Sequence, residues 1–138
     1  MSKLYILDAC SLIAVLADED GSENVTSLIQ DAINKKNILK MNQINLLEVY
    51  YYLCRKYNQD EANKAINKLK EFPIEIIIGM KEAVFNEAGR IKPRYKIPLG
   101  DSIAVAECII NNGILVTSDH DDFAIFEKEN LVEIFWFR

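Results

Sequence analysis

Histidine and cysteine are scarce in this chain of 138 residues, and each shortage narrows the chemistry that the protein can perform. The one histidine, His120, excludes a zinc site built from several imidazoles. The three cysteines are odd in number, widely spaced and set among apolar residues: Cys10, Cys54 and Cys108. We therefore expect three reduced, packed thiols in a reducing cytoplasm, with no C-x-x-C motif for redox or metal chemistry.

Long apolar runs and an excess of positive charge are also missing. The run Leu12–Ala17 is too short for a signal or membrane segment, so we expect a soluble cytoplasmic protein with no membrane partner. With 50% apolar and 27% charged residues, the composition predicts a single globular domain over residues 1–138. Because the net charge is −5, nucleic-acid binding would need a local basic patch, or metal ions held by acids.

Hydrophobic periodicity predicts strands that alternate with helices along almost the whole chain. The predicted strands cover residues 3–7, 38–41, 74–78, 114–117 and 132–137. The predicted helices cover residues 11–17, 25–35, 42–57, 60–72, 81–90, 101–112 and 120–129. This alternation predicts an α/β fold, with helices on both faces of a mostly parallel sheet of about five strands.

Polar and small residues predict where several of these helices begin or end. Asn42 and Asp60 are candidate N-caps. Gly113 stands where a left-handed residue is favoured, after the helix 101–112. Pro93 and Pro98 predict a loop between residues 90 and 101.

Four acids occupy positions where composition alone would not place a charge. Asp8 and Asp119 follow predicted strands, and the carboxyl ends of parallel strands are where open α/β sheets bind ligands. The other two share predicted apolar helix stripes: Glu48 with Ile44, Leu47, Tyr51 and Cys54, and Asp101 with Ala104, Val105 and Cys108. A carboxylate on an inward stripe is costly unless it is paired or bound to a cation, so we expect all four to converge.

Each acid also has a purely structural interpretation. Asp101 could cap its helix, Asp119 could start a turn in SDHDD, and Asp8 could form an Asx turn. Glu48 could lie at the polar edge of a helix whose buried face is made of Val49, Tyr50 and Leu53. All four interpretations would have to hold together for the acidic site to be absent.

Converging carboxylates repel one another, so they need a divalent cation. Oxygen ligands of this kind suit Mg²⁺ or Mn²⁺. Because the chain offers no histidine base and no nucleophile set, the natural chemistry is attack of metal-activated water on a phosphodiester.

Each of the four acids lies in a largely apolar segment, and the segments come in this order along the chain: LYILDACSLIAVL, INLLEVYYYL, PLGDSIAVAECI and GILVTSDHDDF. In these segments and their order, the chain resembles the PIN-domain ribonucleases, and in particular the VapC-type toxins of prokaryotic toxin–antitoxin pairs. The resemblance implies a parallel sheet between helices, with catalytic, metal-binding acids at one edge. Residue by residue, those acids are Asp8, Glu48, Asp101 and Asp119. It also implies a homodimer that a cognate antitoxin holds inactive by covering the acids.

Three neighbouring residues bear on the same resemblance. Asp122, directly before Phe123, is a second candidate for the fourth metal-binding acid. Cys10 stands where a small polar residue is common, so a hydrogen bond from that position to the site is in question. Thr117 could orient the fourth acid through its hydroxyl, or could simply end a strand.

Basic and aromatic residues suggest surfaces for partners. Four bases alternate along the chain just before Asp101, with an aromatic ring among them: Arg90, Lys92, Arg94, Lys96 and Tyr95. We expect them to bind RNA phosphates and stack a base, although a solvated loop is the simpler interpretation. Arg55 and Lys56 complement the dipole of the helix that they end. The same helix carries tyrosines for the core and for a partner: Tyr50, Tyr51, Tyr52 and Tyr57.

The expected function is that of a Mg²⁺- or Mn²⁺-dependent endoribonuclease, and the expected partners are RNA and an antitoxin. One alternative is an RNA-processing PIN nuclease without an antitoxin, and another is a non-catalytic RNA-binding module. A receiver-like signalling module that binds Mg²⁺ is a third alternative. A receiver needs an acceptor aspartate after a middle strand, where Asn42 or Gly79 stands, and a lysine after a later strand, where Ser118 stands.

Overall fold

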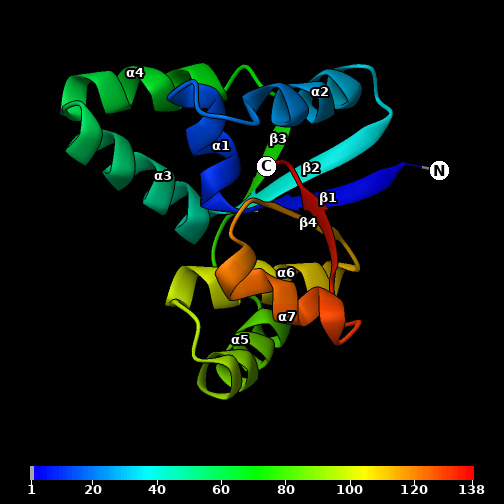
Figure 1. The fold of residues 1–138 in the computed structure, drawn as a ribbon. Helices are drawn as coiled ribbons and strands as arrows, with labels where there is room; N and C mark the ends of the chain where they lie inside the picture. Colours follow the sequence, from blue (N-terminus) through cyan, green and yellow to red (C-terminus); the bar gives the residue numbers. More distant parts are fainter. Residues whose placement is uncertain (1) are drawn as a thin grey trace.

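A computed structural model describes residues 2–138, in which strands and helices alternate as expected (Figure 1). The strands are β1 (Lys3–Leu7), β2 (Asn37–Asn42), β3 (Ile74–Ile77), β4 (Ile114–Thr117) and β5 (Glu133–Trp136). The helices are α1 (Ala9–Leu16), α2 (Ser22–Ile33), α3 (Gln43–Lys56), α4 (Gln59–Leu69), α5 (Glu82–Tyr95), α6 (Leu99–Asn111) and α7 (His120–Lys128). No helix in the described range is long and apolar enough to cross a membrane.

The strands form one sheet in the order β3-β2-β1-β4-β5, and every neighbouring pair is parallel. The central strand β1 is flanked by β2 and β4, so that Tyr5 lies opposite both Leu39 and Ile114. A receiver-like module would have the flavodoxin-like order 2-1-3-4-5. The receiver-like interpretation is therefore wrong.

Helices cover both faces of the sheet. Figure 1 shows α1 to α4 on one side and α5 to α7 on the other. Alternate residues of β1 enter the two cores, because side chains point to opposite faces along a strand. Tyr5 and Leu7 pack in the core under α1 to α4, and Ile6 packs in the core under α5 to α7. The predicted α/β/α sandwich is confirmed, and its sheet of five strands is wholly parallel.

One predicted loop is helical instead. Helix α5 continues through Pro93 to Tyr95 and ends at Lys96, whose φ is 57°. Pro93 removes only one hydrogen bond near the end of the helix, whereas Val84 and Ile91 are buried along its inner face. Packing against α6 therefore outweighs the helix-breaking tendency of the proline.

Two predicted helix ends also fall on different residues. The N-cap of α4 is Asn58, whose side chain accepts the N–H of Glu61 at 2.8 Å, and Asp60 lies inside the first turn. The left-handed residue after α6 is Asn112, with φ 53°, and not Gly113. Gly113 instead allows a close approach to β1, because a Cβ there would lie 3.0 Å from Ile6 Cγ1.

Candidate active site

The acids singled out in the sequence lie near the carboxyl edge of the sheet and come from four parts of the chain. Asp8 directly follows β1, and Asp119 follows β4 and is the N-cap residue of α7. Because β1 and β4 are neighbours, the ends of these strands reach the same edge. Asp101 lies in the first turn of α6, and Glu48 lies in the second turn of α3.

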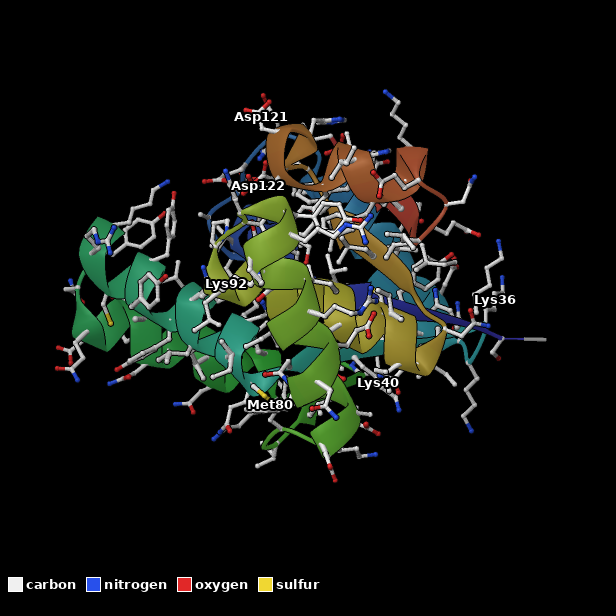
Figure 2. All side chains as sticks on the ribbon, turned by 90° about the horizontal axis from the view of Figure 1, so that it is seen from below. Lys36, Lys40, Met80, Lys92, Asp121 and Asp122 are labelled. Carbon is white, nitrogen blue, oxygen red and sulfur yellow. The ribbon has the colours of Figure 1, made fainter. Side chains whose placement is uncertain are left out.

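Three of the carboxylates come within reach of a single ion. Asp101, Asp119 and Asp122 each present one carboxylate oxygen, and these oxygens lie within 4.8 Å of one another. Asp119 Oδ1 also accepts the N–H of Asp122 at 3.1 Å, so Asp119 caps α7 as well as joining the cluster. Asp101 does not cap its helix, because the N-cap of α6 is Pro98. Figure 2 shows Asp122 at the start of α7, on the other side of the view from Lys36.

Asp8 is buried and held by two side-chain donors. The Thr117 hydroxyl donates to Asp8 Oδ2 at 3.0 Å, and the Cys10 thiol donates to the same oxygen at 3.3 Å. Thr117 Oγ1 also accepts the N–H of Asp119 at 3.1 Å. The Thr117 hydroxyl therefore orients the carboxylate of Asp8 and holds the backbone N–H of Asp119. Cys10 makes the hydrogen bond that the sequence had left in question.

Glu48 is held against the start of α6. Asn45 Nδ2 donates to Glu48 Oε1 at 3.1 Å and to the Gly100 carbonyl at 3.0 Å, so one amide ties α3 to α6. A Cβ at Gly100 would overlap the Glu48 carboxylate, which means that only glycine leaves room for it. These contacts fix the carboxylate beside Asp101, the next residue of α6.

The sequence predicted that Glu48 shares an inward-facing stripe of its helix with Leu47 and Tyr51, and this prediction is wrong. Leu47 and Tyr51 are 53% and 46% exposed, so they do not face the core. The buried residues of α3 are Asn45, Val49 and Leu53. Glu48 is half-buried at the edge of this face, much as the alternative interpretation had it, and the edge is turned toward the other acids.

The pKa values of the acids are raised, chiefly by burial. Burial raises the pKa of Asp8 to about 6, against the opposing effect of the Cys10 and Thr117 hydrogen bonds. Burial, a hydrogen bond with Asp122 and the charge of Asp8 together raise the pKa of Asp101 to about 9. Burial also raises the pKa of Glu48 and of Asp119. In the absence of a bound cation, these carboxylates therefore hold protons more strongly than exposed carboxylates do.

No basic side chain in residues 2–138 neutralises this charge. The ion pairs within 4.0 Å there involve other acids: Glu19, Glu61, Glu75 and Glu87. The atoms that could bind a metal ion at the site are carboxylate oxygens, which suit Mg²⁺ or Mn²⁺ better than softer metals. Raised pKa values, convergence and the lack of a basic partner all fit a divalent cation.

Comparison with known proteins identifies the family. A sequence-family model described as the PIN domain matches residues 5–129. The chain belongs to the PIN-domain family. The family inferred from the four sequence segments is thus confirmed. No curated protein sequence matches this PIN domain.

Solved structures share the fold of this PIN domain at low sequence identity. VapBC2 from Rickettsia felis bound to a DNA fragment is 17% identical over 96% of this chain and 97% of that chain, with a TM-score of 0.73. DNA-bound VapBC from Salmonella typhimurium is 13% identical over 100% of both chains, with a TM-score of 0.73. VapBC-1 from nontypeable Haemophilus influenzae is 18% identical over 97% and 98% of the two chains, with a TM-score of 0.69. At these identities the likeness establishes the fold alone.

The basic run of the PIN domain lies on the last turns of α5 and not on a loop. Arg90 pairs with Glu87 one turn earlier, while Lys92, Arg94 and Lys96 are exposed. Figure 2 shows Lys92 on the same side of the view as Asp122.

Tyr95 is engaged by α7 and the residue that follows it. Its ring packs against Phe126 with centroids 4.5 Å apart, and its hydroxyl donates to Glu129 Oε1 at 2.6 Å. The ring therefore supports the packing of α5 on α7, where the sequence suggested stacking on a base.

The sequence interpretation missed three residues that position the acids. Asn45 lies one helical turn before Glu48, a spacing that the sequence does display. Gly100 stands directly before Asp101, but only the structure shows the close approach of Glu48. Glu107 is 2% exposed and accepts from Asn42 Nδ2 at 2.7 Å, which holds the N-cap of α3 against α6.

Proposed function

We propose that this PIN domain is a Mg²⁺- or Mn²⁺-dependent endoribonuclease that hydrolyses RNA phosphodiesters, and that it is the toxin of a toxin–antitoxin pair. One observation carries the proposal: carboxylates from separate parts of the chain gather at the carboxyl edge of the sheet with no basic partner. These carboxylates are Asp8, Glu48, Asp101, Asp119 and Asp122.

The residues divide into those that would hold a cation and those that position them. Asp101, Asp119 and Asp122 would hold one ion, with Asp8 beside them and Glu48 on the α3 side. A bound divalent cation supplies Lewis acidity and lowers the pKa of water. Thr117 and Cys10 keep Asp8 Oδ2 oriented. Burial raises the pKa of Cys10 to about 12, so this residue acts as a neutral donor and not as a nucleophile.

Glu48 has one oxygen available for chemistry. Oε1 accepts the Asn45 amide, and no hydrogen bond to Oε2 is made by the described side chains. Oε2 is therefore the atom that we assign to a metal ion or to the proton of the attacking water. Burial raises the pKa of Glu48, which makes its carboxylate a better proton acceptor than a freely exposed one.

The partner proposals rest on the similarity to VapBC structures and on the surface of α3. We propose a cognate antitoxin that covers the acids, a homodimer of the toxin and a cytoplasmic location. Tyr51 and Tyr57, 46% and 49% exposed, offer aromatic surface to such a partner. The cysteines are free, which agrees with a reducing compartment.

Cleavage of purified RNA tests the enzymatic proposal. Protein incubated with total RNA should produce discrete new 5′ ends in Mn²⁺, and none when EDTA is added. Asp101→Asn is the matched control, because it removes one ligand charge and preserves the shape of the side chain. Ends that persist in EDTA or in the Asp101→Asn protein would show that the acids do not perform the cleavage.

A co-expression experiment separates the toxin from an RNA-processing nuclease without an antitoxin. A small reading frame adjacent to the gene should encode a protein that co-purifies with this PIN domain and suppresses its cleavage of RNA. RNA cleavage that continues unchanged in the presence of that protein, or the lack of such a reading frame, would favour the RNA-processing alternative.

A further inference from the structure

A second cluster of charge lies beside the acids and plays no part in holding them. Glu19, in the loop between α1 and α2, bridges two cations from distant parts of the chain. Lys56 Nζ, at the end of α3, lies 3.8 Å from Glu19 Oε2, and Arg138 Nη1, after β5, lies 3.8 Å from Glu19 Oε1. The Tyr52 hydroxyl donates to Glu19 Oε2 at 3.1 Å.

This cluster adjoins the acids on two sides. Tyr52 and Lys56 follow Glu48 by one and two turns of α3, so Lys56 stands about 12 Å further along the same side of the helix. Arg138 Nη2 donates to Ser118 Oγ at 3.0 Å, and Ser118 directly precedes Asp119. The two cations thus flank the Glu48 and Asp119 ends of the site.

The arrangement around Glu19 is that of an anion-binding site filled by a side chain. Two cations and a hydroxyl converge on one carboxylate, and a phosphodiester carries the same single charge and the same kind of acceptor oxygens. The bridge is easily exchanged, because its distances are long and the Lys56 and Arg138 side chains are 39% and 41% exposed. Arg138 is also held by the carbonyl of Asp20 at 2.9 Å, so its position does not depend on Glu19 alone.

We propose that Tyr52, Lys56 and Arg138 bind a phosphodiester of the RNA other than the one that is cut, and that Glu19 fills this site when RNA is absent. The proposal rests on the proposed function, since it supplies the substrate contacts of the same nuclease. Binding of the RNA phosphate displaces the Glu19 carboxylate into solvent. Glu19 therefore lowers the affinity for RNA, although it contacts no acid of the metal site.

Equilibrium binding of a fluorescent single-stranded RNA, measured by anisotropy at several salt concentrations, tests the site. The background is Asp101→Asn, so that the RNA stays intact during the measurement. We expect Lys56→Gln and Arg138→Gln each to raise Kd about threefold to tenfold and to reduce the slope of log K against log[salt] by about 0.7. Glu19→Gln should lower Kd several-fold, because it removes the competing carboxylate.

Arg55→Gln is the matched control, since it removes the same charge from the neighbouring position of α3. Arg55 lies over the Tyr51 ring, 5.6 Å from its centroid, and does not contact Glu19 in the described structure. Its Kd should change less than twofold. In the otherwise wild-type protein, the rise in Tm caused by Mn²⁺ should be the same in all four variants, because the carboxylates of the metal site are untouched.

A lower Tm of Glu19→Gln without a gain in RNA affinity would overturn the proposal. Glu19 would then serve only to hold the loop between α1 and α2 against α3. Unchanged Kd values in Lys56→Gln and Arg138→Gln, or no measurable RNA binding, would overturn it as well. Failure of the nuclease is recognised separately. If the wild-type protein binds RNA through Lys56 and Arg138 but never cuts it, the phosphate site stands and the enzymatic proposal fails.

Discussion

Asp101 is only 9% exposed, and no basic side chain in residues 2–138 forms an ion pair with it, yet other carboxylates surround it. At the scale of the residue, such a group weakens the metal-free fold, because burial and like charge both disfavour its ionised form. Asp8 is in the same situation, although the Thr117 and Cys10 hydrogen bonds offset part of the cost. The acids are thus poor contributors to stability in the place where they are suited to bind a cation.

Neutral isosteres should separate these two effects. Asp8→Asn or Asp101→Asn should reduce RNA cleavage by more than about 100-fold, since even outer-shell partners of a metal contribute about 10- to 100-fold. In EDTA, the Tm of Asp101→Asn should equal or exceed that of the wild type, because one source of repulsion is gone. Cleavage assays and thermal unfolding on the same preparations provide the measurement. Folded variants that cut RNA at the wild-type rate would contradict the assignment.

The raised pKa values also predict how the metal-free protein responds to pH. The pKa of Asp8 rises from 3.8 to about 6 and that of Asp101 from 3.8 to about 9, so the folded state holds more protons than the unfolded state between these values. The stability that these two groups contribute is therefore fully present below about pH 3.8, and the free energy of unfolding should fall as pH rises from there toward 9. Thermal unfolding in EDTA from pH 5 to 9 measures this trend.

Two comparisons make the pH experiment specific. Asp101→Asn should lose less stability over the same range, because the group with the largest shift is no longer titrated. Saturating Mn²⁺ should also flatten the profile, since the cation replaces the protons. A profile in EDTA that is flat, or that rises with pH, would mean that these carboxylates are ionised in the folded metal-free protein.

At the scale of the element, the contact between α3 and α6 sets the place of Glu48. Two polar contacts join these helices: Asn45 to the Gly100 carbonyl, and the Asn42 cap to Glu107. Both asparagines come from the first turn of α3 or just before it. The start of the helix is therefore pinned, and Glu48 follows from it by helical geometry.

Substitution of the glycine under Glu48 tests this contact. Gly100→Ala should displace the Glu48 carboxylate, because the new Cβ would overlap it, and should lower cleavage about 10- to 100-fold. The fold should survive, since alanine is favoured over glycine in a helix by about 1 kcal/mol and the group that must move is the end of a flexible side chain. Cleavage rate and Mn²⁺ affinity are the readouts.

Gly89→Ala is the matched control within α5, where a Cβ would meet nothing within 4 Å. This variant should keep full activity and gain a little stability. Equal loss of activity in the two variants would place the effect outside the Glu48 contact.

The sequence predicted the elements better than it predicted their faces. The strand before Asp8 and the strand before Asp119 are short apolar runs, and both are strands in the structure. The face of α3 was not predictable in the same way, because Leu47 and Tyr51 are apolar or aromatic yet exposed. Helical spacing alone cannot distinguish a buried apolar stripe from an exposed apolar surface. The helical course of α5 through Pro93 likewise depends on burial against α6, the next helix of the chain, and the local signal of the proline does not report that burial.

At the scale of the whole molecule, bound cation and fold should be thermodynamically linked. The unfolded chain does not gather the acids, so we expect Mn²⁺ to bind the folded state selectively. At a concentration 100-fold above Kd the ion adds about 2.7 kcal/mol, or roughly 10 °C in Tm for a domain of this size. Differential scanning calorimetry with Mn²⁺, Mg²⁺ and EDTA measures the shift. Glu48→Gln should reduce the shift, and an equal shift in that variant would place the ion away from Glu48.

The distribution of charge over the molecule leads to the last prediction. The net charge is −5 and the acids occupy one edge, so RNA is repelled unless cations or basic residues surround that edge. On α5 and its cap, Lys92, Arg94 and Lys96 are exposed and lead into α6, which carries Asp101 in its first turn. Replacing all three with glutamine should raise the Kd for RNA about 30-fold and reduce the salt slope by about 2. The rise in Tm caused by Mn²⁺ should persist, because no carboxylate is changed.

The control for this substitution removes the same charge from the opposite edge of the sheet. Lys3, Lys35 and Lys36 are exposed near the amino ends of β1 and β2, and Figure 2 shows Lys36 across the view from Asp122. If binding depended only on net charge, both triple variants would lose RNA affinity equally. If α5 contacts RNA phosphates, only the variant on α5 loses affinity and salt dependence. Equal RNA affinity and salt dependence of the two triple variants would mean that Lys92, Arg94 and Lys96 only form a solvated helix end. The RNA would then be bound on the side of the site near Lys56 and Arg138.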